Sequence, residues 1–186
     1  MYPVVAKGLI PGHMLLPGRD YKDTPGLNAK GLKTLHKTIA HFKSYKMLAL
    51  GPDAAAITEA IQTIAEKASA KIWFCSPYAD IPGGVDLAYL TGTNAQTLLA
   101  LLQEALQHSN NNSVIAIGNI HASAQMEAAW QAIKNDPNVT VTIDTYHLGL
   151  VFFRHGQAKQ HFIVRPYRSF LLDAFLGIRS LWGLRA

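Results

Sequence analysis

One strand–turn–helix unit decides how this chain is interpreted: AIGNIHASAQMEAAW, residues 116–130. Its apolar start is typical of a buried strand, and the run after Ser123 has the spacing of an amphipathic helix. In an α/β protein the polar residues at such a strand end usually face the ligand crevice. The turn offers Asn119 and His121 and no carboxylate. The unit therefore poses the question of whether this is a working site or the remains of one.

Units of the same kind precede it along the chain. Apolar side chains at helical spacing predict a helix over 29–42, a second after residue 53, a third through residue 107 and a fourth stopped by Pro137. The residues expected to cap these helices are Asn28, Asp53, Asn94 and Ser123. The predicted strands that separate them are KMLALG, KIWFCS, VDLAYLTG and SVIAIGN, and HSNNN (108–112) has the composition of a polar turn.

The alternation of predicted strands and helices ends after residue 138. VTVTIDTY (139–146) alternates with the period of a strand, and GLVFFR (149–154) is separated from HFIVRP (161–166) by the spacing of a hairpin. Strand–helix alternation followed by closely spaced strands predicts an α/β, Rossmann-like, mostly parallel sheet with a C-terminal antiparallel hairpin and helices on both faces. We expect three parts: an extended arm over 1–28, the α/β domain over 29–167 and an amphipathic helix over 168–186.

Composition narrows the class of protein. The chain has 186 residues, 49% of them hydrophobic, and a formal net charge of +5. The basic residues are scattered rather than clustered, so we expect no nucleic-acid partner. Cys75 is the single cysteine, which excludes an internal disulfide and a Cys-based zinc site, and which suits a reducing, cytoplasmic setting. No segment approaches the roughly 20 apolar residues of a membrane-spanning helix.

The final segment, 168–186, has a wide apolar face. A helix of this kind packs on its own domain, forms a homodimer with a second subunit, or lies on a membrane surface. Packing or a homodimer is favoured over membrane contact. Its apolar residues are Phe170, Leu171, Ala174, Phe175, Ile178, Leu181 and Trp182.

The strand ends supply the remaining candidate residues. Gly51 stands alone, without the further glycines of a dinucleotide or P-loop motif, so an ordinary strand-to-helix turn competes with a cofactor site there. Cys75 has no base beside it in sequence and is favoured as a buried thiol. His121 is able to exchange a proton near neutral pH, and Asn119 to orient a substrate, although a structural histidine is the more common case. The remaining histidines are too dispersed to predict a metal site.

From Asn111 onward the sequence resembles a class I S-adenosylmethionine-dependent methyltransferase family of Bacteroidetes, most closely at MEAAW, VTVTID, GLVFFR and QAKQHF. Upstream, LALG is similar to the family's first-strand motif E-L-G, and TGTN (91–94) to its D-G-N-H. The resemblance implies a methyltransferase-type fold. That fold has a further helix–strand–helix between the second and third strands, for which YADIPGG (78–84) is too short, so we expect a shortened sheet.

The departures from the family coincide with its chemistry. Ala49, Cys75, Thr91, Gly118 and Asn119 stand where the family has acidic residues, while His121 remains. We therefore expect a non-catalytic protein with an eroded cofactor site and no cofactor, acting through binding or assembly. The alternative is an active methyltransferase with His121 and Asn119 as its catalytic residues. Its S-adenosylmethionine would then lie against Gly51, Asp53, Cys75, Ser76 and Thr91.

Overall fold

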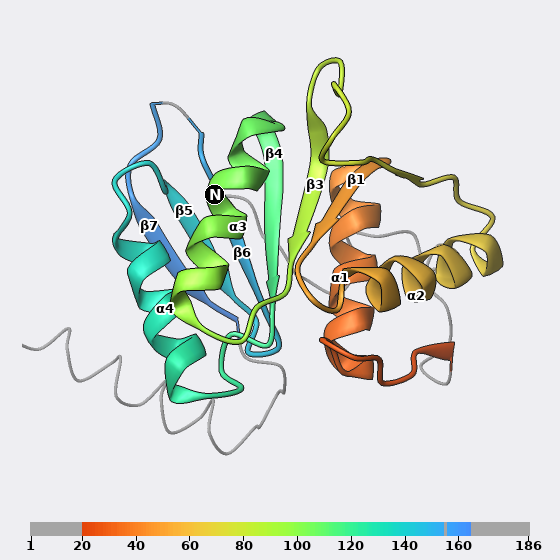
Figure 1. Cartoon of the computed structure of the whole chain (residues 1–186), viewed down its shortest axis with the longest axis horizontal. Coiled ribbons are helices and arrows are strands. Elements are labelled where there is room, and N and C mark those ends of the chain that lie inside the picture. Colours follow the sequence, from red (N-terminus) through yellow and green to blue (C-terminus); the bar gives the residue numbers. More distant parts are fainter. Residues whose placement is uncertain (1–19, 155, 165–186) are drawn as a thin grey trace, which may run out of the picture.

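The computed structural model describes residues 20–154 and 156–164, and within them the strands form one seven-stranded sheet of order β2-β1-β3-β4-β6-β5-β7 (Figure 1). β2, β1, β3 and β4 pair in parallel, β6 runs antiparallel to both β4 and β5, and β7 is parallel to β5. The predicted α/β class, with a mostly parallel sheet and an antiparallel C-terminal pair, is confirmed. The strands are β1 Lys46–Leu50, β2 Trp73–Phe74, β3 Val85–Leu90, β4 Ser109–Gly118, β5 Val141–Asp144, β6 Leu148–Phe152 and β7 Gln160–Ile163.

Four helices cover the two faces of this part of the sheet: α1 Ala29–Phe42, α2 Ala54–Lys67, α3 Ala95–Gln107 and α4 Ala124–Asn135. The apolar stripes of α1 and α2 pack on one face, in a cluster that includes Leu35, Ile61 and Tyr89. α3 and α4 cover the other face, where Leu102 and Trp130 are buried, and Figure 1 shows this pair of helices side by side in front of the sheet. Helices on both faces bury the central strands on both sides, as expected of a Rossmann-like sheet.

Three of the four predicted helix caps are confirmed. The side-chain oxygens of Asn28, Asn94 and Ser123 accept hydrogen bonds from backbone N–H groups in the first turns of α1, α3 and α4. Asp53 occupies the N-cap position of α2, but its side chain makes no capping hydrogen bond, so the expectation that it caps this helix was wrong in that respect. Its backbone, at φ −100° and ψ 11°, departs from the extended conformation that aims a capping oxygen at the first turn.

The expected shortening of the fold is also confirmed. Residues 75–84, all of which the structure describes, connect β2 to β3 through turns with no helix or strand. β2 is consequently the edge of the sheet and pairs with β1 over two residues only.

Two local predictions were wrong. GLVFFR and HFIVRP do not pair with each other: β6 forms its hairpin with β5, and β7 lies along the far side of β5. The reason is that β6 already has β4 on one side and β5 on the other, which leaves β7 only the free edge of β5. HSNNN is no turn either, since residues 109–112 begin β4.

The segment before α1 packs onto the domain. Tyr21 and Leu27 are buried, and Thr24 and Leu27 form an isolated antiparallel bridge. We call residues 24–28 the strap, because they lie against side chains from β3 and from the turn after β4. The predicted helix over 168–186 and most of the predicted arm lie outside the described residues. No helix in the described part of the chain is long and apolar enough to cross a membrane.

Candidate functional site

The carboxyl edge of the sheet contains a topological switch point between β1 and β3. The chain leaves β1 toward α2 on one face and leaves β3 toward α3 on the other. In open α/β sheets ligands bind in the crevice outside such a pair of strands. Gly51 and Thr91 are the first residues after these two strands, so two of the predicted cofactor-binding residues meet here.

Gly51 and Thr91 are in direct contact. Gly51 has a φ of +109°, and a Cβ atom built on it would lie 2.0 Å from the backbone oxygen of Thr91. The Thr91 hydroxyl accepts a hydrogen bond from the backbone N–H of Asp53 at 3.2 Å. Gly51, Asp53 and Thr91 thus form one cluster. In this cluster the loop after β1 and the loop after β3 contact each other directly.

Cys75 and Ser76 lie apart from that cluster, after β2. The backbone N–H of Cys75 donates to Met47 at 2.7 Å, and the Ser76 hydroxyl accepts from the backbone N–H of Tyr78 at 3.3 Å. Partial burial, opposed by the Lys46 charge and assisted by Asp86, raises the pKa of the Cys75 thiol. Cys75 is only partly buried, so the prediction of a buried thiol was wrong in that respect, but a thiol that stays protonated is a poor nucleophile.

Asn119 is held by the strap. It adopts a left-handed backbone conformation (φ 53°), which asparagine tolerates better than most residues. Its side-chain nitrogen donates to the carbonyl oxygen of Gly26 at 3.0 Å, and the Tyr89 hydroxyl donates to the same oxygen at 3.2 Å. Burial, together with the Asp53 charge, raises the pKa of Tyr89 far above its ordinary value. Its hydroxyl is therefore protonated and available as a donor.

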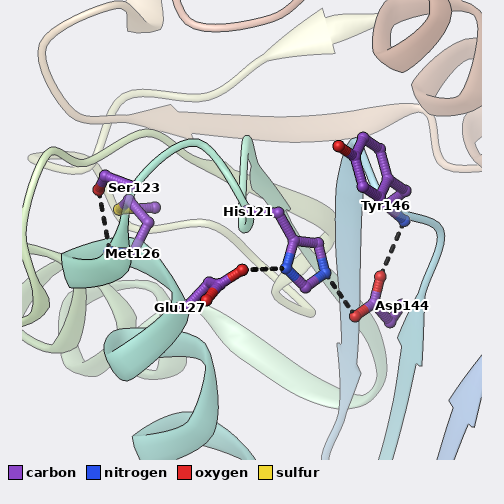
Figure 2. Close-up of polar contacts among 6 residues, drawn as sticks. All are labelled: His121, Ser123, Met126, Glu127, Asp144 and Tyr146. Atoms are coloured by element: carbon purple, nitrogen blue, oxygen red, sulfur yellow. Dashed lines mark hydrogen bonds and ion pairs between the residues drawn. The ribbon is translucent and has the colours of Figure 1, made fainter.

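His121 is bound at both ring nitrogens (Figure 2). Nε2 lies 2.8 Å from Oδ2 of Asp144, and Nδ1 lies 3.2 Å from Oε1 of Glu127. Burial lowers the pKa of His121, but the hydrogen bonds and charges of Asp144 and Glu127 outweigh it, so the net shift is upward. Because carboxylates only accept, both ring nitrogens carry protons in this arrangement. With both protons in place, the ring connects the end of β5 to the first turn of α4.

Tyr146 completes this cluster. Its ring stacks on His121 with centroids 5.5 Å apart, and its backbone N–H donates to Oδ1 of Asp144 at 2.8 Å. Its φ of 73° is a genuine outlier for a bulky residue. Figure 2 shows the histidine between the two carboxylates, with Asp144 bound also to the tyrosine backbone.

The sequence pointed to His121 but not to its partners. Asp144 is the last residue of β5 but lies two residues before the end of the predicted strand 139–146, so the rule that drew attention to Asn119 would have found it only with the correct strand end. Glu127 stands on the helix that follows His121, six residues on, and nothing in the sequence pairs the two. Among residues 20–154 and 156–164, no group of three or more His, Cys, Asp or Glu side chains is arranged to hold a metal ion.

The strap contacts both the loop after β1 and the turn after β4. A Cβ atom on Gly26 would lie 2.6 Å from the Cβ of Asp53, so this glycine packs against the loop after β1 while its carbonyl binds Asn119. The structure therefore brings Gly51, Asp53, Thr91, Asn119 and His121 to one edge of the sheet.

Comparison with known proteins gives a weak likeness to methyltransferases. No family model matches the sequence, and no curated protein is significantly similar to it. The chain is similar to PaMTH1 from Podospora anserina, solved with SAH, at 11% identity and a TM-score of 0.45, over 78% of this chain and 89% of that one. It is similar to the O-methyltransferase TomG from Streptomyces achromogenes, solved with SAM, at 14% identity and a TM-score of 0.44, over 69% and 81% of the two chains. At these identities and TM-scores the likeness carries no conclusion about activity.

Proposed function

We propose that this protein is a non-catalytic, methyltransferase-like protein that acts through binding or assembly rather than methyl transfer. The observation that carries the proposal is that polar residues at the carboxyl edge of the sheet already bind other parts of the same chain. Thr91 accepts from Asp53, Asn119 donates to Gly26, and His121 donates to two carboxylates. A ligand that used these groups would first have to break the intramolecular contacts.

The donor chemistry supports the same proposal. A nucleoside bound across a switch point has its ribose hydroxyls held by a carboxylate after the second strand, because an anion accepts both hydrogen bonds strongly. In this chain that place is taken by Cys75 and Ser76, neither of which is an anion there. At the first strand, the backbone of Gly51 lies against the Thr91 carbonyl rather than facing open space. These residues do not fit S-adenosylmethionine.

The state of His121 bears on catalysis. A general base needs a ring nitrogen with a free lone pair near the substrate proton. The two carboxylates occupy both nitrogens and favour the protonated ring. His121 in this arrangement stabilises the turn between β4 and α4 instead of accepting a proton.

Titration calorimetry of the full-length protein with S-adenosylmethionine and S-adenosylhomocysteine tests the proposal. We expect no binding heat with either compound, while TomG, which was solved with SAM, gives a clear isotherm in the same buffer. A parallel melting experiment gives the same decision. A ligand present at a thousand times its dissociation constant stabilises a protein by about 4 kcal/mol, so a melting temperature that rises by several degrees would show that a cofactor binds and would refute the proposal.

A further inference from the structure

The strap is held at two points by loops from the carboxyl edge. At its middle, Asn119 donates to the carbonyl of Gly26. At its C-terminal end, the side chain of Asn28 lies 3.0 Å from Nδ1 of His147, in the loop between β5 and β6. The two loops are joined to each other, because the backbone N–H of Asn119 donates to the carbonyl of His147 at 2.9 Å.

The hydrogen bond at Asn28 fixes the state of His147. The Oδ1 atom of Asn28 already accepts from the backbone N–H of Gly31 at 2.8 Å, as the cap of α1. The atom that faces His147 is therefore the amide nitrogen, which can only donate. Nδ1 of His147 must accept, so this contact requires the neutral ring.

The hydrogen bond from Asn119 to Gly26 depends on a protonated His121, whereas the contact at Asn28 requires a neutral His147. The protonated ring binds Asp144 on β5 and Glu127 on α4, and so fixes the turn that carries Asn119. Tyr146 connects the two histidines, since it stacks on His121 and makes an edge contact with His147 at 5.0 Å between centroids. The two rings thus lie on either side of one strained tyrosine, with opposite demands for a proton.

We propose that His121 and His147 form a latch that holds the strap over the carboxyl edge only while His121 is protonated and His147 is neutral. Deprotonation of His121 leaves Asp144 or Glu127 without its donor and loosens the turn that carries Asn119. Protonation of His147 turns an acceptor into a donor facing the donor of Asn28. The latch is closed within a window of pH and opens on both sides of it.

The electrostatic surroundings of the two rings agree with such a window. Burial and then the nearby Lys30 charge lower the pKa of His147, whereas the two carboxylates give His121 a net upward shift. A raised histidine pKa stabilises the fold below the ordinary value near 6.5, and that contribution is lost as the pH rises through the folded-state pKa. A lowered pKa does the reverse, and its contribution is lost as the pH falls through the same ordinary value and then the folded-state pKa.

Other groups near the strap titrate as well. Tyr89 stays protonated throughout because its pKa is far above the ordinary value. His36, buried and bound to Tyr21 ahead of the strap, has its pKa lowered by burial, so acid affects this region through a second histidine. The carboxylate of Asp23 accepts from the backbone N–H of Ala29 and places a further charged group beside the strap. The experiment must therefore separate His147 from these neighbours.

Hydrogen exchange of the strap measures the latch directly. The reporters are the amides of Thr24, Leu27, Ala29 and Gly31, each of which makes a hydrogen bond within the strap or at its junction with α1. Millisecond labelling of the full-length protein from about pH 5 to about pH 10 gives protection factors once the intrinsic exchange rate at each pH is divided out. We expect protection to be greatest between the two histidine pKa values and to fall by about fivefold on either side, the factor that the loss of one net hydrogen bond produces.

Three glutamine variants test which histidine causes the fall in protection at low pH (the acid limb) and which causes the fall at high pH (the alkaline limb). His147→Gln keeps an acceptor that does not titrate, so it should flatten the acid limb and leave the alkaline limb. His121→Gln should remove the alkaline limb. His161→Gln is the matched control, because His161 also has a pKa lowered by burial and by Lys134 and Lys159, but it lies on the edge strand β7 and binds the Thr142 hydroxyl. Both limbs should persist in that variant.

A protection profile that is flat with pH in the wild type would overturn the latch, and so would a His121→Gln profile identical to that of the wild type. Should a glutamine variant fail to fold, the imidazole signals of the wild-type protein decide by NMR. The titrations of His121 and His147 must coincide with the alkaline and acid limbs, and any other coincidence refutes the proposal. The latch rests on the proposed function, because the strap lies over the crevice at the carboxyl edge that the proposed function describes as closed. The exchange experiment uses no cofactor. A failure of the latch can therefore be told apart from a failure of the proposed function, which a binding isotherm with S-adenosylmethionine would show.

Discussion

The two regions of the carboxyl edge are closed by different chemistry. Between β1 and β3 the backbone of Gly51 lies against the backbone of Thr91, in a contact that depends on the absence of a side chain. Beyond β4 the closure is made by hydrogen bonds and charges, from Asn119 to the strap and from His121 to two carboxylates. The first region is therefore sensitive to added volume, whereas the second is sensitive to the loss of donors and to protonation.

The largest effect is expected at the first region. Gly51→Ala places a Cβ atom 2.0 Å from the Thr91 carbonyl oxygen, on a residue with a φ of +109°. Steric overlap and backbone strain together should lower the free energy of unfolding by about 4 kcal/mol, measured by urea titration.

Gly156→Ala is the control for that substitution. Gly156 also has a positive φ, of +77°, but a Cβ atom there would meet nothing within 4 Å. It should cost only the strain of the left-handed conformation, about 1 kcal/mol. Equal losses in the two variants would mean that the contact between Gly51 and Thr91 does not close the crevice.

An intermediate effect is expected where two donors share one acceptor. Tyr89→Phe and Asn119→Gly each remove one hydrogen bond to the Gly26 carbonyl, and glycine keeps the left-handed backbone of residue 119. Each should cost about 1 kcal/mol, because the carbonyl retains the other donor. The double variant leaves the carbonyl with neither donor, so a double-mutant cycle should give a coupling of about 1 kcal/mol. Additive losses would contradict a shared acceptor.

The smallest effect is expected at Asp53, in a comparison of the helix starts of the two regions. Ser123→Ala removes a side-chain bond to the first turn of α4 and should cost about 1 kcal/mol. Asp53→Ala, at the same position of α2, removes no capping bond and should change the free energy of unfolding by less than about 0.5 kcal/mol. Thermal unfolding of both variants under one condition tests the difference, and a larger loss at Asp53 would mean that its carboxylate stabilises the strap.

Local features were predicted well because their causes are local. The bounds of α1 agree with those expected from its cap and its apolar spacing, and the missing helix–strand–helix followed from the length of one loop. The pairing of β7 could not be predicted from the sequence, because it depends on which strand edges are still free once β6 lies between β4 and β5. The start of β4 was missed for a similar reason: Asn110 and Ser113 bind Gly83 and Val85, residues far away in the sequence.

The candidate site was predicted in the same way: the sequence indicated where its residues lie but not what they bind. That Thr91, Asn119 and His121 lie at the carboxyl edge follows from strand ends, which a sequence reveals. Their partners come from elsewhere in the chain: Asn119 binds a carbonyl 93 residues away, and Asp144 reaches His121 from a strand of its own. Hydrophobic spacing carries no information about such contacts, because they depend on the path of the strap across the finished sheet.

Gly118 has a consequence for how this protein could change. A Cβ atom at this position would lie 2.1 Å from the Tyr89 hydroxyl and 2.9 Å from the Gly26 carbonyl. An acidic residue introduced here by one substitution would collide with the Tyr89 hydroxyl, and removing that hydroxyl first would take away one hydrogen bond to the strap. Each single step therefore gives a less stable chain, so an acidic side chain at this position requires both substitutions together.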